Sequence, residues 1–119
     1  RGARLIVELA GGLLVPYRIG SAPFLQADWL ARVRPRIALV ARAGLGTLNH
    51  TLLTLEALRA RALEPELLLL VGAPHPENAA TLRDLAGVAV QFALPPLEPL
   101  DGAALERWLA AQPLAEALR

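Results

Sequence analysis

The sequence has 119 residues and a formal net charge of +1, with 55% hydrophobic and 19% charged residues. This length fits one domain, the apolar content excludes a disordered chain, and the charge gives no bulk field to hold nucleic acid or an anionic membrane. Every basic residue is an arginine and there is no cysteine, which excludes a P-loop lysine, a lysine nucleophile, disulfides and thiolate chemistry within these residues.

The first predicted element in chain order is a strand over residues 4–9, an apolar run that Gly11 and Gly12 end. The following elements are a helix over 22–33, a strand over 37–41, a helix over 48–62, a strand over 67–71, a helix over 76–86, a strand over 88–92 and a helix that begins at 102 or 103. Apolar strands that alternate with amphipathic helices predict βαβ crossovers. We therefore expect a single α/β domain over 1–119, with a mostly parallel sheet and flanking helices.

The apolar stretch 3–17 is interrupted by a charge, two glycines and a proline, so we expect no membrane span. No signal-peptide pattern is present, which favours a cytoplasmic protein. The chain contains no methionine and opens almost directly into its first strand. These features predict that an N-terminal part belongs with it, although a processed short protein would have the same features.

Ligands bind at the carboxyl ends of the strands in an open parallel sheet, so the turns after the strands are the candidate sites. The first is Glu8 to Gly12, where a carboxylate suits Mg²⁺ beside a phosphate and paired glycines allow close backbone approach. A strand end followed by a plain turn would show the same residues.

The second candidate turn, residues 43–51, opens the clearest helix, whose first N–H groups lack partners and favour an anion. Thr47 is the predicted N-cap, and a capped helix without a ligand remains the alternative. Asn49 stands where a dinucleotide fingerprint needs its third glycine, and the next strand ends at Gly72 without an acid. The sequence therefore argues against a nicotinamide or flavin site.

The third candidate turn, residues 72–78, contains His75, which is either a catalytic base or an exposed loop residue with no placed partner. Residues 95–97 are rigid and apolar, so they could wall a nucleobase pocket or form a stiff loop. Trp29 and Trp108 are interpreted as packing residues.

Two strings resemble the dethiobiotin synthetase family. Residues 7–16, Val-Glu-Leu-Ala-Gly-Gly-Leu-Leu-Val-Pro, are similar to the family's V-E-G-A-G-G-…-P segment, and residues 44–54 are similar to its L-G-T-I-N-H-x-x-L-T pattern. Residues 27–29 fall where the family has an A-D-hydrophobic helix. The resemblance covers residues 4–100 and implies a P-loop NTPase-like fold that acts as a homodimer.

The resemblance further implies ATP- and Mg²⁺-dependent closure of a cyclic urea on 7,8-diaminopelargonic acid with CO₂, which gives dethiobiotin. Glu8 matches the family's Mg²⁺ ligand. The implied nucleotide contacts are Glu8, Leu9, Ala10, Gly11, Gly72, Ala73, Pro95, Pro96 and Leu97. The implied contacts to the diamine's carboxylate, which reach into the neighbouring subunit's site, are Gly46, Thr47, Leu48 and Asn49.

The chain departs from the family in three ways. The P-loop and the catalytic lysines have no counterpart here, Leu9 replaces a glycine, and Gly72 stands where many members have an adenine-reading Asn. No catalytic residue is therefore implied within the chain, and we expect no turnover from it alone. The alternatives are a degenerate, non-catalytic α/β interaction module, or a related P-loop ATPase or amidotransferase-type protein.

Overall fold

The computed structural model describes residues 5–88 and 91–113. Its elements in chain order are β1 (Pro16–Arg18), β2 (Phe24–Leu25), α1 (Gln26–Val33), β3 (Ala38–Arg42), α2 (Thr47–Arg59), β4 (Leu67–Val71), α3 (Pro76–Ala86), β5 (Gln91–Leu94) and α4 (Gly102–Ala110). Strands and helices alternate from β3 onwards, as βαβ connections require.

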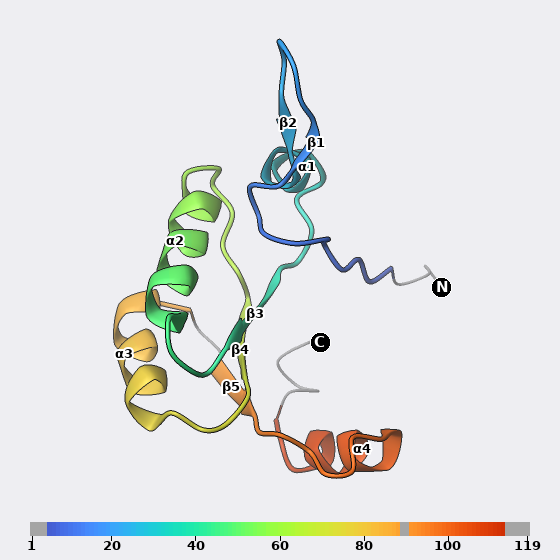
Figure 1. The fold of residues 1–119 in the computed structure, drawn as a ribbon, viewed down its shortest axis with the longest axis vertical. Coiled ribbons are helices and arrows are strands. Elements are labelled where there is room, and N and C mark those ends of the chain that lie inside the picture. Colours follow the sequence, from blue (N-terminus) through green and yellow to red (C-terminus); the bar gives the residue numbers. More distant parts are fainter. Residues whose placement is uncertain (1–4, 89–90, 114–119) are drawn as a thin grey trace.

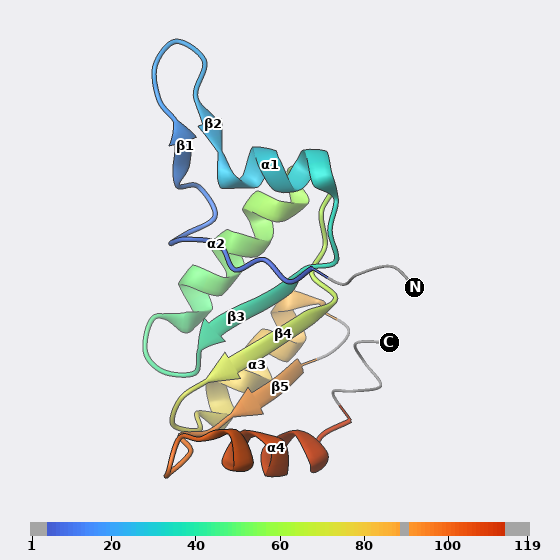
Figure 2. The same ribbon diagram turned by 90° about the vertical axis from the view of Figure 1, so that its right-hand side faces the viewer.

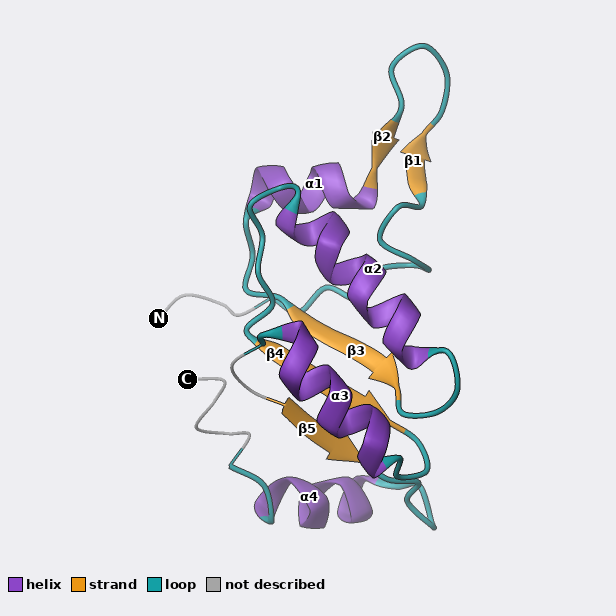
Figure 3. Cartoon of the chain, turned by 90° about the vertical axis from the view of Figure 1, so that its left-hand side faces the viewer, coloured by secondary structure: helices purple, strands orange, loops and turns teal. Residues whose placement is uncertain are grey.

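The central sheet has three strands in the order β3–β4–β5, and both pairings are parallel. Helices α2 and α3 cover one of its faces (Figure 1), and Figure 3 shows them lying across it. Helix α4 lies beyond β5, on the side away from α2 and α3. The predicted α/β class with a parallel sheet is confirmed.

The main core fills the layer between the sheet and these two helices. Leu68 and Leu70 of the central strand meet Leu55 of α2 and Leu82 of α3, and each of the four side chains is at most 2% exposed. Strand β4 is apolar along its whole length because it has a neighbouring strand on both sides. This core makes the sheet a rigid base for the loops at its carboxyl edge.

A second cluster joins α1 to the far end of α2. It consists of Leu30, Leu58 and Leu63, with Leu9, Leu13 and Trp29 packed against it. Strands β1 and β2 form an antiparallel hairpin that projects beyond α1, away from the sheet (Figure 2). This hairpin was not predicted, and the helix predicted over 22–33 begins only at Gln26 because β2 occupies the two residues before it.

The predicted strand over residues 4–9 is wrong for the described residues 5–9, which form no strand. Leu5 and Ile6 are 86% and 94% exposed instead of buried. An apolar run becomes a parallel strand only when neighbouring strands satisfy its backbone and cover its side chains, and the described part of the chain pairs none with it.

The other predicted bounds differ less. The helix predicted over 48–62 is α2, which ends at Arg59, and the strand predicted over 88–92 lies at 91–94. Val88 is outside that strand, and residues 89–90 lie outside the described residues. The bounds predicted for β4 and α3 agree with the structure.

Candidate functional site

The carboxyl ends of the three parallel strands lie at one edge of the sheet, and backbone hydrogen bonds connect the turns that leave them. The Ala43 N–H donates to the Val71 carbonyl at 2.9 Å, and the Gly72 N–H donates to the Leu94 carbonyl at 3.0 Å. Each bond extends the pairing of neighbouring strands by one residue. The predicted turns at 43–51, 72–78 and 95–97 are therefore held side by side.

Helix α2 begins in the turn after β3, and Gly46 is its N-cap. The predicted cap, Thr47, is instead the first helical residue. Gly46 has a φ of 87°, a left-handed conformation that a side chain disfavours. The Thr47 hydroxyl is buried and lies 3.3 Å from that of Thr51, one turn along the helix, so it has a partner without acting as a cap.

Two backbone amides at the start of α2 remain available. The Thr47 N–H donates to the Gly44 carbonyl and the His50 N–H donates to the Gly46 carbonyl. The N–H groups of Leu48 and Asn49 donate to no partner in the described part of the chain. Unpaired amides at the positive end of a helix attract anions, an interaction worth about 0.3–1 kcal/mol when exposed.

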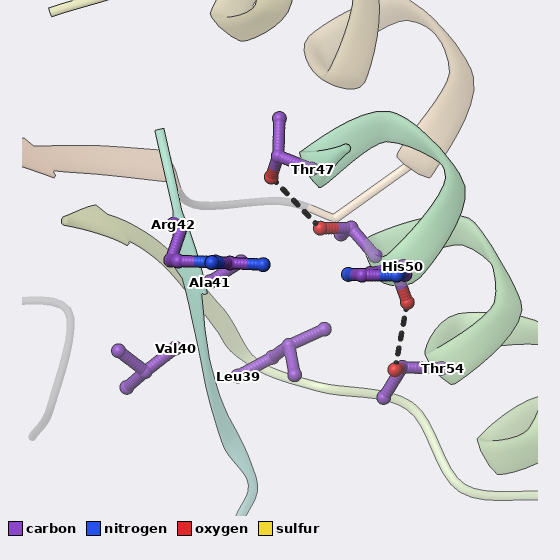
Figure 4. A pocket seen from close by; sticks show the side chains of 8 residues that line it. Leu39, Val40, Ala41, Arg42, Thr47, His50 and Thr54 are labelled. Carbon is purple, nitrogen blue, oxygen red and sulfur yellow. Dashed lines mark hydrogen bonds between the residues drawn. The ribbon is translucent and has the colours of Figure 1, made fainter. Parts of the chain in front are cut away.

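A hollow of about 220 Å³ lies beside this helix start. Its lining residues are Leu39, Val40, Ala41 and Arg42 of β3 and Thr47, His50, Thr51 and Thr54 of α2. Figure 4 shows the side chains of Arg42 and His50 directed toward each other across it. Arg42 forms no ion pair with another described residue. The hollow therefore combines the Arg42 guanidinium, without an ion-pair partner among residues 5–88 and 91–113, with the end of a helix, which suits an anionic group.

Asn78 holds the turn between β3 and α2 in place. Its side-chain Nδ2 donates to the Ala43 carbonyl at 3.0 Å and lies 3.4 Å from the Gly44 carbonyl. It comes from the first turn of α3, which sequence reasoning treated as ordinary helix. An amide side chain just after a strand-end turn was the signal that could have identified it.

The buried side chain of Gln26, at the start of α1, holds the Glu8 to Gly12 segment in place. The Gln26 Nε2 donates to the carbonyls of Ala10 at 2.9 Å and of Gly12 at 2.8 Å. Leu9 packs against the Leu30, Leu58 and Leu63 cluster. The side chain of Leu9, which replaces a glycine of the family, is therefore partly buried against this cluster, while the neighbouring residues 10–12 are exposed.

Helix α1, which carries Gln26, has a defined start. The Leu25 N–H donates to the Asp28 Oδ2 at 2.9 Å, and the Arg61 Nε lies 3.3 Å from Asp28 Oδ1. The hydrogen bond from Leu25 is the largest influence that lowers the pKa of Asp28, and Arg61 lowers that pKa further while burial opposes both. Both contacts favour the ionised carboxylate.

A second hollow, of about 350 Å³, lies at the carboxyl ends of β4 and β5. Its lining residues are Val71, Gly72, Leu94, Pro95, Pro96, Leu97, Glu98 and Leu100. The structure thus brings the predicted Gly72 together with the predicted 95–97 loop, and Ala73 lies outside the lining. Val71, Leu94 and Leu100 were missed because strand ends and isolated leucines carry no distinctive motif.

The predicted site residues do not form one continuous pocket in this chain. Residues 8–11 line neither hollow, and of Gly46 to Asn49 only Thr47 lines the first. Among the described residues no group of three or more His, Cys, Asp or Glu side chains is arranged to hold a metal. One carboxylate beside phosphate oxygens and waters is nevertheless a normal Mg²⁺ environment, so the exposed Glu8 fits that ion only together with a nucleotide.

No helix in the described ranges is long and apolar enough to cross a membrane.

Comparison with known proteins gives a consistent set of relatives. A family model described as "AAA domain" matches residues 1–104. The chain is 44% identical over 108 residues to the ATP-dependent dethiobiotin synthetase BioD of Rhizorhabdus wittichii, a match that covers 91% of the chain and 50% of that protein. It is 41% identical over 106 residues to the protein of the same name from Agrobacterium fabrum, covering 89% of the chain and 49% of that protein.

A third relative is the biotin biosynthesis bifunctional protein BioCD of Bordetella avium, 38% identical over 116 residues, covering 98% of the chain and 24% of that protein. The chain therefore spans about half the length of the single-function relatives it matches.

Proposed function

The chain belongs to the protein family described as the AAA domain, and we propose that it forms part of an ATP-dependent dethiobiotin synthetase that works as a cytoplasmic homodimer. The reaction would close a cyclic urea on 7,8-diaminopelargonic acid with CO₂, at the expense of ATP. The names of the relatives support ATP dependence and biotin synthesis. The contributions assigned below to single residues are our proposal.

The observation that carries this proposal is the anion-binding character of the start of α2. The unpaired N–H groups of Leu48 and Asn49 would receive the carboxylate tail of the diamine, together with Gly46 and Thr47. Arg42, which lines the adjacent hollow opposite His50, adds positive charge close to that carboxylate. In a dimer these groups would extend into the site of the neighbouring subunit.

The nucleotide would lie along the same edge of the sheet. Residues 8–11 would face its phosphates, with Glu8 holding Mg²⁺, which neutralises part of the phosphate charge when it is bound. Gly72 with residues 95–97 would contact the base, and Ala73 would contact it from outside the hollow lining. Gly72 has no side chain to hydrogen-bond adenine, so the base would be held mainly by shape and apolar contact.

The remaining catalytic groups would come from outside these 119 residues. The chain contains no lysine, so no ammonium group from it can stabilise the transferring phosphoryl group. Strand β3 pairs only with β4 among the described residues, and its outward-facing Val40 is 60% exposed. A further parallel strand could pair with that free edge and give the apolar residues 5–7 the neighbour that a strand requires, whereas Val40 lies on a face of the sheet that only another layer would cover.

A chimera tests the proposal. The half of the Rhizorhabdus wittichii enzyme that lies outside the match would be joined to residues 1–119. We expect ATP-dependent dethiobiotin formation from the folded chimera, and none from residues 1–119 alone. In the chimera, Glu8→Gln should abolish turnover while leaving the melting temperature unchanged. Product from residues 1–119 alone, or a folded chimera whose rate does not depend on Glu8, would contradict the assignment.

A non-catalytic module remains the alternative that this experiment separates. It predicts a folded chimera that forms no product but still binds a second copy of itself. A leucine in place of the family's glycine at position 9 favours that alternative, whereas the packing of Leu9 against the cluster around Leu30 supports room for a phosphate.

A further inference from the structure

We propose that Gln26 is a positioning residue that sets the 8–12 loop for contact with nucleotide phosphates, through its buried amide between the Ala10 and Gly12 carbonyls. This inference rests on the proposed function, because it concerns the same nucleotide site. Gln26 matches no part of the motifs that identify the family in the sequence. It is 0% exposed, whereas the loop that it holds is largely exposed.

The hydrogen bonds fix the orientation of this amide. Both carbonyl oxygens only accept, so the side-chain nitrogen must face Ala10 and Gly12. The Gln26 Oε1 accepts from the Tyr17 hydroxyl at 3.1 Å. The two donor hydrogens and the acceptor are all used, which leaves a single arrangement of the side chain that satisfies every group.

The backbone of Gln26 and its neighbour reinforces the same contact. The Gln26 N–H donates to the Val15 carbonyl and the Ala27 N–H donates to the Leu13 carbonyl, both at 3.0 Å. The Val15 N–H closes the turn by donating to the Gly12 carbonyl, also at 3.0 Å. Residues 10–15 are therefore tied at several points to the start of α1, and the side chain of Gln26 supplies the two bonds nearest the proposed phosphate contact.

This arrangement separates the acceptors of the loop from its donors. The carbonyls of Ala10 and Gly12 turn inward to Gln26, whereas the N–H groups of residues 9–12 donate to no partner in the described ranges. A phosphate is attracted by free amides and repelled by carbonyl oxygens. Holding the carbonyls away from the ligand is thus what a phosphate-contacting loop needs.

Gly12 gives independent support. A Cβ placed there would meet no atom within 4 Å, and its backbone is not in the left-handed region. The fold therefore does not require a glycine at this position. Close approach of a ligand does require one, since a side chain would stand between the backbone and the phosphate.

The test compares Gln26→Leu with Gln91→Leu in ¹⁵N-labelled chain titrated with Mg·ADP. Gln91 is the matched control, because its Nε2 also donates to a backbone carbonyl, that of Ala79 at 3.1 Å, in a partly buried position. Gln91 and Ala79 are both far from the 8–12 loop in the sequence. In the unmodified chain and in Gln91→Leu, we expect the amide resonances of Gly11 and Gly12 to shift together with those of Gly72 and Ala73. In Gln26→Leu, only the Gly72 and Ala73 resonances should shift, and the affinity should fall about tenfold or more, as for other residues that orient a ligand-binding group.

A second variant and a second measurement distinguish a loss of positioning from a general unfolding of Gln26→Leu. Tyr17→Phe removes only the hydroxyl that orients the amide, at an exposed residue, and should weaken the Gly11 and Gly12 shifts without changing the melting temperature. Heteronuclear NOE values of Gly11 and Gly12 without ligand should fall in Gln26→Leu and remain unchanged in Gln91→Leu.

The outcomes separate the two proposals. If Mg·ADP shifts no resonance of the unmodified chain, the proposed nucleotide site fails, and the NOE values still decide whether Gln26 orders the loop. If Gly72 and Ala73 respond while Gly11 and Gly12 do not, or if Gln26→Leu retains ordered loop amides that respond normally, the positioning role is wrong.

Discussion

Replacing Gly46 with alanine tests whether the start of α2 depends on a left-handed residue. At a φ of 87° a residue with a Cβ costs about 1–2 kcal/mol, partly offset by about 0.4–1 kcal/mol because alanine restricts the unfolded chain. The new Cβ would meet only His50 Cε1, at 3.9 Å, which is an ordinary contact. The cost is therefore confined to the backbone, and we expect the free energy of unfolding to fall by about 1 kcal/mol.

Thermal and urea unfolding of Gly46→Ala and Gly12→Ala measure this effect. An unfolding entropy of about 0.25 kcal/mol/K for a chain of this length converts 1 kcal/mol to a loss of about 4 °C in melting temperature. Gly12→Ala is the control and should stay within about 0.5 kcal/mol of the unmodified protein, because nothing lies near its Cβ. Equal stability of the two variants would refute the reasoning about the turn before α2.

Three further predictions concern the elements that support the site. Asn78→Ala should lower the urea-derived free energy of unfolding by about 1 kcal/mol, because the carbonyl of Ala43 loses its donor; an unchanged midpoint would show that the 3.0 Å bond contributes nothing. Leu82→Ala should cost about 2–5 kcal/mol, whereas Leu85→Ala on the same helix, where the leucine is 59% exposed, should cost much less; equal losses would contradict the core assignment. Asp28→Asn should lower the melting temperature at pH 7, because a carboxylate whose folded-state pKa is lowered stabilises the fold above its unfolded pKa of about 3.9. The difference should shrink as the pH falls below that unfolded value and through the lower folded one, and a difference that stays constant into acid would count against a lowered pKa.

The elements predicted best are those whose own residues indicate where the strand or helix begins and ends. Strand β4 is a run of four leucines and a valine buried between two strands, and α3 begins with a proline at its first helical position and is followed by Gly87, so its bounds were predicted correctly. The helix start at Gly46 was recognised through its glycines, although Thr47 was wrongly taken as the cap. In these segments the secondary structure that the local sequence favours is also the one that the packing of the whole fold requires.

The errors have one physical origin: contacts with residues that are distant in sequence determine the local structure of these segments. Residues 5–9 have the composition of a strand, but no described strand pairs with them, so residues 5–8 stay exposed and only Leu9 packs against a helix cluster. The β1–β2 hairpin was missed although Gly20-Ser21 lies in its connecting loop, because strands of 3 and 2 residues with an irregular ladder are too short to show an alternating pattern. Gln26 was missed because its importance comes from contacts with Ala10 and Gly12, more than ten residues away in sequence.

The candidate site also combines features that the local sequence indicates with features that depend on distant contacts. Glycines and a helix start mark the candidate turns in the sequence, and backbone hydrogen bonds connect the turns after β3, β4 and β5 along one edge of the sheet. The residues that hold the turns, Gln26 and Asn78, are single amides without a motif, and only the folded chain reveals them. Motifs thus indicate candidate ligand contacts more readily than the residues that hold those candidates in place.

The central claim is that the free amides at the start of α2 receive a carboxylate. The direct measurement is a titration of the ¹⁵N-labelled chain with 7,8-diaminopelargonic acid and separately with its methyl ester. The account predicts saturable shifts of the Leu48 and Asn49 amide resonances with the acid and none with the ester. Unmoved Leu48 and Asn49 resonances, or equal shifts with both compounds, would contradict it.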